Sequence, residues 1–90
     1  MEKIFVDYIS DGRRIKVWGE PRTMEVFRGT IVQAVSSLDG LSDSTIDDHG
    51  GISFPLKDGI TPVNMIDLVA ERLKDAISED HIIQPHYAPI

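Results

Sequence analysis

The stretch that decides the fold is residues 3–19, KIFVDYISDGRRIKVWG. Two runs rich in β-branched and aromatic residues flank Asp11-Gly12. That dipeptide suits the type I′ turn of a two-residue β-hairpin, because both central residues of such a turn need positive φ. With Asp11 and Gly12 at the centre, residues whose numbers sum to 23 lie opposite one another. We therefore expect an N-terminal antiparallel hairpin in this register.

This register sorts the side chains onto two faces of the hairpin, because alternate residues of a strand point in opposite directions. The face expected to build the core carries Ile4, Val6, Tyr8, Ile15 and Val17. The other face sets Phe5 opposite Trp18, Asp7 opposite Lys16, and Ile9 opposite Arg14. A hairpin face in contact with water usually carries few apolar residues. Phe5, Ile9 and Trp18 therefore need a cover, which is either the tail around Tyr87, a second helix layer or another chain.

Residues 23–38 have the spacing of an amphipathic helix, with Thr23 as the expected N-cap. Apolar side chains recur at Met24, Phe27, Ile31, Ala34, Val35 and Leu38. Gly29 and the β-branched run 30–32 weaken this prediction, because both lower helix propensity. A strand over residues 24–32 is the alternative.

Residues 61–77 predict a second and longer amphipathic helix. Thr61 is a suitable N-cap, and Pro62 suits the first helical position, where its missing N–H is not needed. The apolar stripe consists of Val63, Ile66, Val69, Ala70, Leu73, Ala76 and Ile77. Met65 and Leu68 make this stripe wider than a thin two-layer domain requires, so the helix is also a candidate partner contact.

The segment IDDHGGISFPL, residues 46–56, looks most like an active site, because it combines two carboxylates with a histidine. Asp47, Asp48 and His49 would be the ligands of a small metal-dependent activity. The calcium-loop pattern fails, because its glycine and glutamate positions hold other residues. The interpretation that we prefer is a turn that joins a short strand before Asp47 to a strand at residues 52–54, since Asp and Gly both suit turn geometry.

Composition limits the class of protein. The 90 residues include no cysteine, which excludes disulfides, thiolate zinc sites and a cysteine nucleophile. An apolar fraction of 41% with 27% charged residues is typical of a globular protein, and no linker divides residues 1–90, so one domain is expected. No signal peptide and no apolar run of about 20 residues occurs, so the expected location is cytoplasmic. No nucleophile elbow or phosphate-binding loop is present.

Charge is distributed unevenly along the chain. Residues 1–28 carry six Lys and Arg against five Asp and Glu, whereas residues 29–90 carry three against ten. The hairpin cations Arg13, Arg14 and Lys16 lie near Trp18, a combination that binds single-stranded nucleic acid. A net charge of −6 disfavours that function, and Asp7 is expected to neutralise Lys16. The acidic remainder of the chain either keeps the protein in solution or faces a basic partner, in the extreme as an inhibitor that imitates phosphate.

The predicted architecture is a small α+β domain. It has an N-terminal hairpin, a helix, a short strand pair, a long amphipathic helix and an extended C-terminal tail. Two prolines exclude a regular helix from that tail, where Ile82 and Ile83 are able to add a short edge strand. The sheet is expected to have three to four strands, with residues 61–77 packed on the face that carries Ile4.

The predicted function is noncatalytic protein binding by a small regulator, inhibitor or accessory subunit. The expected contact residues are Phe5, Ile9, Arg14 and Trp18, because Trp and Arg are enriched at binding hot spots. No enzyme activity, cofactor or metal site is expected, and no membrane. The expected partner is another protein, which includes a second copy of this chain in a homodimer, and single-stranded nucleic acid is the alternative.

Overall fold

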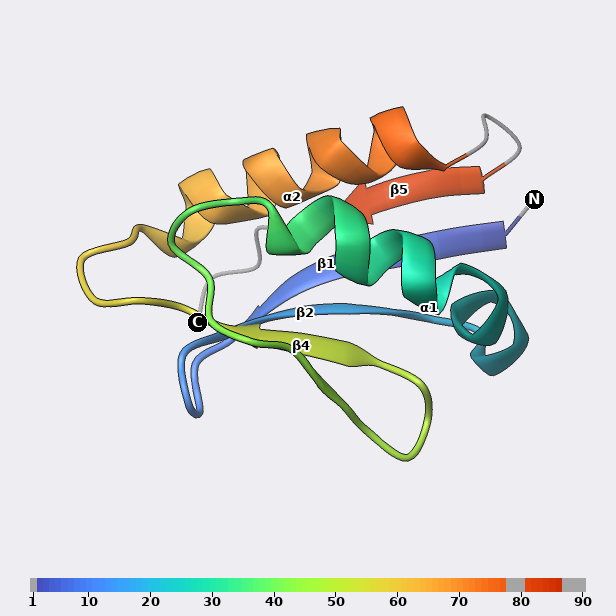
Figure 1. The fold of residues 1–90 in the computed structure, drawn as a ribbon, viewed down its shortest axis with the longest axis horizontal. Coiled ribbons are helices and arrows are strands. Elements are labelled where there is room, and N and C mark those ends of the chain that lie inside the picture. The colour runs from blue at the N-terminus through green and yellow to red at the C-terminus, as the bar shows by residue number, and fades with distance from the viewer. Residues whose placement is uncertain (1, 78–80, 87–90) are drawn as a thin grey trace.

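A computed structural model describes residues 2–77 and 81–86, which form two helices and five strands (Figure 1). The strands are β1 (Glu2–Ile9), β2 (Arg14–Gly19), β3 (Thr45–Ile46), β4 (Ile52–Pro55) and β5 (His81–Pro85). The helices are α1 (Pro21–Ser36) and α2 (Pro62–Ala76). The sheet has the order β3-β4-β2-β1-β5, with β5 parallel to β1 and the other pairs antiparallel. The α+β class is confirmed, but the expected strand number is wrong, because the tail adds β5 at one edge.

The hairpin formed by β1 and β2 has the predicted register. Phe5 lies opposite Trp18, and Ile9 lies opposite Arg14. The predicted type I′ turn is wrong, because positive φ occurs at Gly12 (82°) and Arg13 (46°) rather than at Asp11 and Gly12. The chain turns over four residues, and the N–H of Arg13 donates to the Ser10 carbonyl at 3.1 Å. The residues with positive φ therefore lie one position later in the sequence than predicted, whereas the strand pairing is as predicted.

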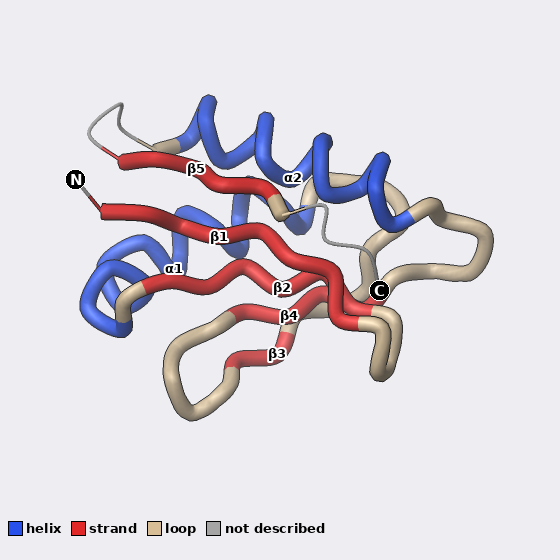
Figure 2. Tube along the Cα trace, turned by 180° about the vertical axis from the view of Figure 1, so that it is seen from behind, coloured by secondary structure: helices blue, strands red, loops and turns tan. Residues whose placement is uncertain are grey.

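Both helices cover the same face of the sheet, as Figures 1 and 2 show. α1 connects β2 to β3 across β4, whereas α2 connects β4 to β5 across β2 and β1. The two connections start from antiparallel strands and run toward opposite edges of the sheet. Crossovers of the same hand therefore place both helices on one side, and such connections are almost always right-handed. The second face has no described helix over it, so the alternative of a sheet between two helix layers is wrong.

The hydrophobic core lies between the sheet and the two helices. The sheet contributes the buried side chains of Ile4, Val6, Ile15, Val17, Ile52, Phe54 and Ile83. The helices contribute Met24, Ile31, Val35, Met65, Ile66, Val69, Ala70 and Leu73. The predicted core face of the hairpin is therefore confirmed, with Tyr8 half-buried against the same cluster. The packing of the second helix on this face is confirmed too, since α2 contacts β1, β2 and β5.

α1 is helical through residues 24–32, so the strand alternative for that segment is wrong. The helix begins at Pro21, and Thr23 is buried within its first turn instead of serving as the N-cap. The signal that was missed is the proline, whose fixed φ suits the first helical position. The helix also ends earlier than expected, at Ser36.

α2 begins at Pro62 as predicted, although the side chain of Thr61 makes no capping hydrogen bond. Met65, which we had expected outside the core stripe, is buried in the core. Val63 was expected to be buried and is instead 50% exposed, because it lies at the margin of the stripe centred on Val69. Leu68 is likewise exposed and stays a candidate for contact with a partner. None of the helices that the structure describes is long and apolar enough to cross a membrane.

The strand pair on either side of the Asp-His-Gly-Gly turn is confirmed, since β3 and β4 pair with Thr45 opposite Ser53. The predicted edge strand in the tail is confirmed as β5, which pairs along β1 and sets Gln84 beside Phe5. Tyr87, the residue expected at the centre of the cover over the hairpin, lies outside the described residues. Among the described residues of the tail, His86 is the last one that covers this side of the sheet.

Candidate binding site on the open face of the sheet

The open face is the side of the sheet that points away from the helices. Strand register assigns to it Phe5, Asp7, Ile9, Arg14, Lys16, Trp18, Thr45, Ser53 and Gln84. The cross-strand pairs arrange these side chains in three rows. A polar row, Thr45-Ser53-Lys16-Asp7, separates the aromatic pair Phe5 and Trp18 from the pair Ile9 and Arg14. The four residues predicted to contact a partner therefore share one face, two on each side of the polar row.

The aromatic side of the open face is a stack of three rings. The rings of Phe5 and Trp18 lie 4.5 Å apart at an angle of 24°, and the imidazole of His86 lies 5.0 Å from Phe5. Trp18 remains 36% exposed, whereas Phe5 is half-buried beneath its neighbours. Residues of the tail thus cover part of Phe5, and the indole forms the outer surface of the stack.

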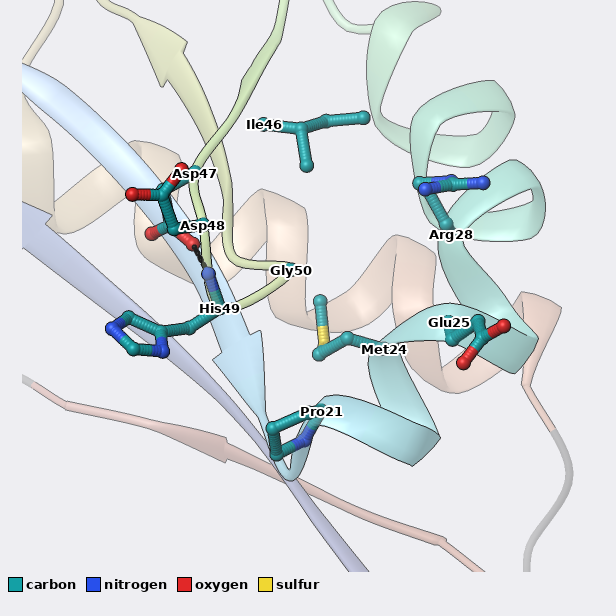
Figure 3. A pocket seen from close by; sticks show the side chains of 9 residues that line it. All are labelled: Pro21, Met24, Glu25, Arg28, Ile46, Asp47, Asp48, His49 and Gly50. Carbon is teal, nitrogen blue, oxygen red and sulfur yellow. Dashed lines mark hydrogen bonds between the residues drawn. The ribbon is translucent and has the colours of Figure 1, made fainter.

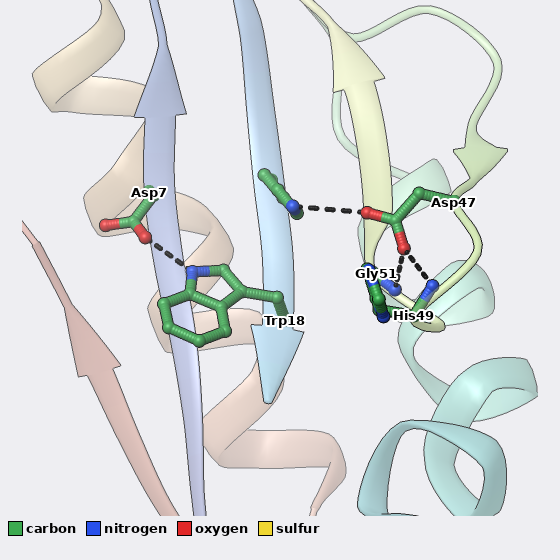
Figure 4. A network of polar contacts seen from close by, with 6 residues as sticks. Asp7, Trp18, Asp47, His49 and Gly51 are labelled. Carbon is green, nitrogen blue, oxygen red and sulfur yellow. Dashed lines mark hydrogen bonds and ion pairs between the residues drawn. The ribbon is translucent and has the colours of Figure 1, made fainter. Parts of the chain in front are cut away.

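Asp7 is the polar hub of this face, a role that sequence reasoning missed. Its Oδ2 accepts a hydrogen bond from the indole Nε1–H of Trp18 (Figure 4). Its Oδ1 lies 2.7 Å from Nδ1 of His86. The expected neutralisation of Lys16 by Asp7 is not the contact that forms, because Lys16 pairs with Asp47 instead. The available signal was the diagonal position of Trp18 relative to Asp7 on the neighbouring strand. The carboxylate ties β1, β2 and the end of the tail together.

Asp47 organises the turn between β3 and β4. Its Oδ1 accepts the backbone N–H groups of His49 and Gly51, both at 2.9 Å, and its Oδ2 lies 3.1 Å from Nζ of Lys16 (Figure 4). A Cβ added at Gly51 would lie 2.7 Å from Oδ2 of Asp47, so only glycine fits against this carboxylate. Both oxygens are therefore engaged within the chain, as the turn interpretation of residues 46–56 requires.

These contacts determine the acidity of Asp47. Partial burial alone would raise its pKa, but the hydrogen bond from Lys16, the N–H groups of Gly51 and His49, and the charge of Lys16 together lower the pKa below the usual aspartate value. The ionised form of Asp47 is therefore the form that the folded turn prefers.

Stability should depend on pH through Asp47. A folded-state pKa below the unfolded value gives stability that is present above the unfolded value and is lost as the pH falls through the folded one. We expect the free energy of unfolding of the wild type to drop more steeply below about pH 4 than that of Asp47→Asn, whose amide oxygen still accepts the two N–H groups. Urea unfolding across the acid range measures the difference.

The matched control for this experiment is Asp48→Asn. Asp48 is exposed, and no polar contact joins it to another described residue. Its substitution should leave the wild-type pH dependence in place. A difference between wild type and Asp47→Asn that stays constant at every pH would contradict the role given to Asp47.

Among the hollows lined by described residues, three contain residues of the turn. One, of about 310 Å³, lies between the turn and the first half of α1, with Met24 at its base and Glu25, Arg28 and Asp48 around it (Figure 3). Two others lie on the open face, on either side of the Lys16–Asp47 ion pair. The hollow of about 350 Å³ is lined by Trp18 and His49 among others, and that of about 340 Å³ by Arg14 and Ser53 among others. The open face therefore combines exposed aromatic surface with two concave sites.

The candidate ligands of the metal hypothesis do not form a cluster. Within residues 2–77 and 81–86, no three His, Cys, Asp or Glu side chains come together as a metal site requires. Asp47 points to Lys16 and its own turn, and Nδ1 of His86 faces Asp7.

Comparison with known proteins adds a distant structural likeness. No family model matches the chain, and no curated protein matches it. The chain is similar to an essential ribosomal processing protease, Prp, from S. aureus, whose structure was solved in complex with a covalently linked product peptide. The TM-score is 0.38 and the identity 12%, over 96% of this chain and 100% of that one. A likeness at this level transfers no activity, substrate or residue role.

The comparison does correct one expectation. The sequence predicted a protein that is not an enzyme, whereas the similar structure is that of a protease.

Proposed function

We propose that this chain is a protein-binding domain that uses the open face of its sheet. Phe5, Ile9, Arg14 and Trp18 are the contact residues. The role that follows is that of a small regulator, inhibitor or accessory subunit in the cytoplasm. The observation that carries the proposal is the one-sided packing, which leaves these four residues on a face without a described helix.

The exposed indole supports this choice of surface. Trp18 is held in a fixed orientation by its stack on Phe5 and its hydrogen bond to Asp7, yet 36% of it is exposed. A rigid aromatic side chain loses little conformational entropy on binding and contributes a large apolar area. Such residues are typical anchors of protein interfaces.

The charges on this face favour a partner segment that carries a carboxylate beside an apolar side chain. Lys16 is already paired with Asp47. Arg14, in contrast, donates its Nε–H to the Asp11 carbonyl at 3.3 Å and makes no ion pair with any described residue. A carboxylate from the partner would compensate Arg14, while an apolar neighbour would cover Trp18.

Single-stranded nucleic acid is supported less well, because most of the cations near Trp18 are occupied. Lys16 lies 3.1 Å from Asp47, and Arg13 lies 3.9 Å from Asp58 and donates to the Ile60 carbonyl at 3.1 Å. The edge of the indole is bound to Asp7. Phosphate groups would have to compete with these carboxylates.

The experiment that tests the proposal has two stages. Affinity capture from the native host supplies a candidate partner, and calorimetry with the purified pair then measures the dissociation constant for each variant. Trp18→Ala should weaken binding at least about tenfold, as expected for an interface anchor. Ile9→Ala, on the other side of the polar row, should weaken it in the same direction.

Val26→Ala is the matched control. Val26 is 68% exposed on α1, whose helix covers the opposite face of the sheet, so its truncation should leave the affinity unchanged. Circular dichroism checks that each variant is folded. Weaker binding for Val26→Ala together with unchanged binding for Trp18→Ala would contradict the proposal. Sedimentation of the wild type alone tests self-association, and a dimer lost in Trp18→Ala would replace the foreign partner with a second copy.

A further inference from the structure

We infer that the hollow over Arg14 and Ser53 is a binding site for a single carboxylate of the protein partner, an inference that rests on the proposed function. The hollow has a volume of about 340 Å³. Side chains from four neighbouring strands or their ends line it, among them Ile9, Arg14, Lys16, Thr45 and Ser53. It lies on the open face beside the polar row, within the patch proposed to contact the partner.

The first argument is the state of Arg14. Its Nε–H donates to the Asp11 carbonyl, which fixes the side chain at the end of the hairpin. Among the described residues no carboxylate pairs with its guanidinium, whereas the neighbouring cations Arg13 and Lys16 each have an aspartate. A positioned guanidinium without an acid partner is suited to bind a planar anion through two parallel hydrogen bonds.

The second argument is independent and concerns Ser53. The residue is only 5% exposed, and it lies between Lys16 and Thr45 on the open face. Its side chain lines the hollow. A serine hydroxyl at this position is able to donate a hydrogen bond to an oxygen atom that enters the hollow.

The charges around the hollow select the class of anion. Lys16 and Arg14 are positive, and the carboxylate of Asp47 also lines the hollow, where it pairs with Lys16. The local balance therefore suits one negative charge rather than the higher charge of a phosphate. Ile9 adds an apolar wall that fits the methylene groups of an Asp or Glu side chain.

The test uses sodium acetate as the probe and NMR of the full chain as the readout. At constant ionic strength, acetate should shift the Nε–H signal of Arg14 and the amide signals around Ser53 in a saturable way, whereas chloride should not. Arg14→Gln should abolish saturation. Ser53→Ala should weaken acetate binding about two- to tenfold, the value of one hydrogen bond. Arg14→Lys, which keeps the charge but loses the two-pronged geometry, should weaken it too.

Arg13→Gln is the matched control, because it removes a neighbouring cation that is paired with Asp58, and it should leave acetate binding unchanged. Acetate shifts that rise linearly, that spread over the surface or that survive Arg14→Gln would overturn the inference. Tighter binding of inorganic phosphate than of acetate would also overturn it, in favour of a phosphate-bearing ligand.

The two proposals fail separately. If Trp18→Ala weakens binding of the partner but acetate does not bind at Arg14, the proposed function stands and the carboxylate site is overturned. If acetate binds at Arg14 but Trp18→Ala leaves the affinity for the partner unchanged, the assignment of the carboxylate to a protein partner on this face is overturned. Loss of both acetate and partner binding in Arg14→Gln, with a folded chain, supports both.

Discussion

Replacing Phe54 by alanine is expected to lower the free energy of unfolding by about 3–5 kcal/mol, the usual cost of removing a buried aromatic ring. Phe54 is fully buried on β4, opposite Ile15, on the side of the sheet that both helices cover. The loss is a large share of the roughly 5–15 kcal/mol that stabilises an ordinary domain. Urea unfolding followed by far-ultraviolet circular dichroism measures it.

Phe5→Ala is the matched control for this substitution, because it removes the same ring from the opposite face of the same sheet. Phe5 is half-buried and contacts Trp18 and His86 rather than the main core. Its truncation is expected to cost less than half as much as that of Phe54. Equal losses would mean that the open face is covered as well as the core, which contradicts the one-sided packing.

The parts of this fold that could be predicted from sequence depend on local signals. The alternation of side chains around Asp11-Gly12 was enough to predict the pairing of β1 with β2. The predicted turn type was wrong, but this did not change the pairing, because several turns are compatible with one register. The proline at position 62 and the regular apolar spacing after it determined the start of α2. The start of α1 was missed because Thr23 and Pro21 are competing signals two residues apart.

The parts that could not be predicted depend on contacts between distant segments. The tail offered Ile82 and Ile83 as an edge strand, but nothing local shows that β5 pairs in parallel with β1. That pairing is what brings His86 to Asp7, and it therefore creates the polar hub of the candidate site. The placement of both helices on one face follows from the strand order, which is also not local. The hairpin register correctly placed the four proposed contact residues on one face. The hollow at Ser53 could not be predicted, because it also needs the neighbouring strand β4.

Asp7→Ala is expected to lower the free energy of unfolding by about 1.5–3 kcal/mol, the range for hydrogen bonds to a charged group. The side chain of Asp7 is 21% exposed and binds both the indole N–H of Trp18 and Nδ1 of His86. Its removal leaves both groups without their acceptor and loosens the link between the tail and β1. Asp48→Ala, at an exposed carboxylate, should change the stability by no more than about 0.5 kcal/mol. An effect of Asp7→Ala as small as that of Asp48→Ala would contradict the role of Asp7 as a hub.

Asp7→Asn separates the two consequences of this role. The amide keeps the size of the side chain and one acceptor oxygen, so the fold should be retained with a smaller loss of stability than in Asp7→Ala. The indole N–H of Trp18 should exchange with solvent faster than in the wild type, which NMR measures directly. If binding depends on the orientation of the Trp18 ring, the affinity for the partner should fall in Asp7→Asn, although the indole itself is intact. Unchanged affinity would mean that the partner does not require the stronger hydrogen bond that the carboxylate of Asp7 accepts from the indole.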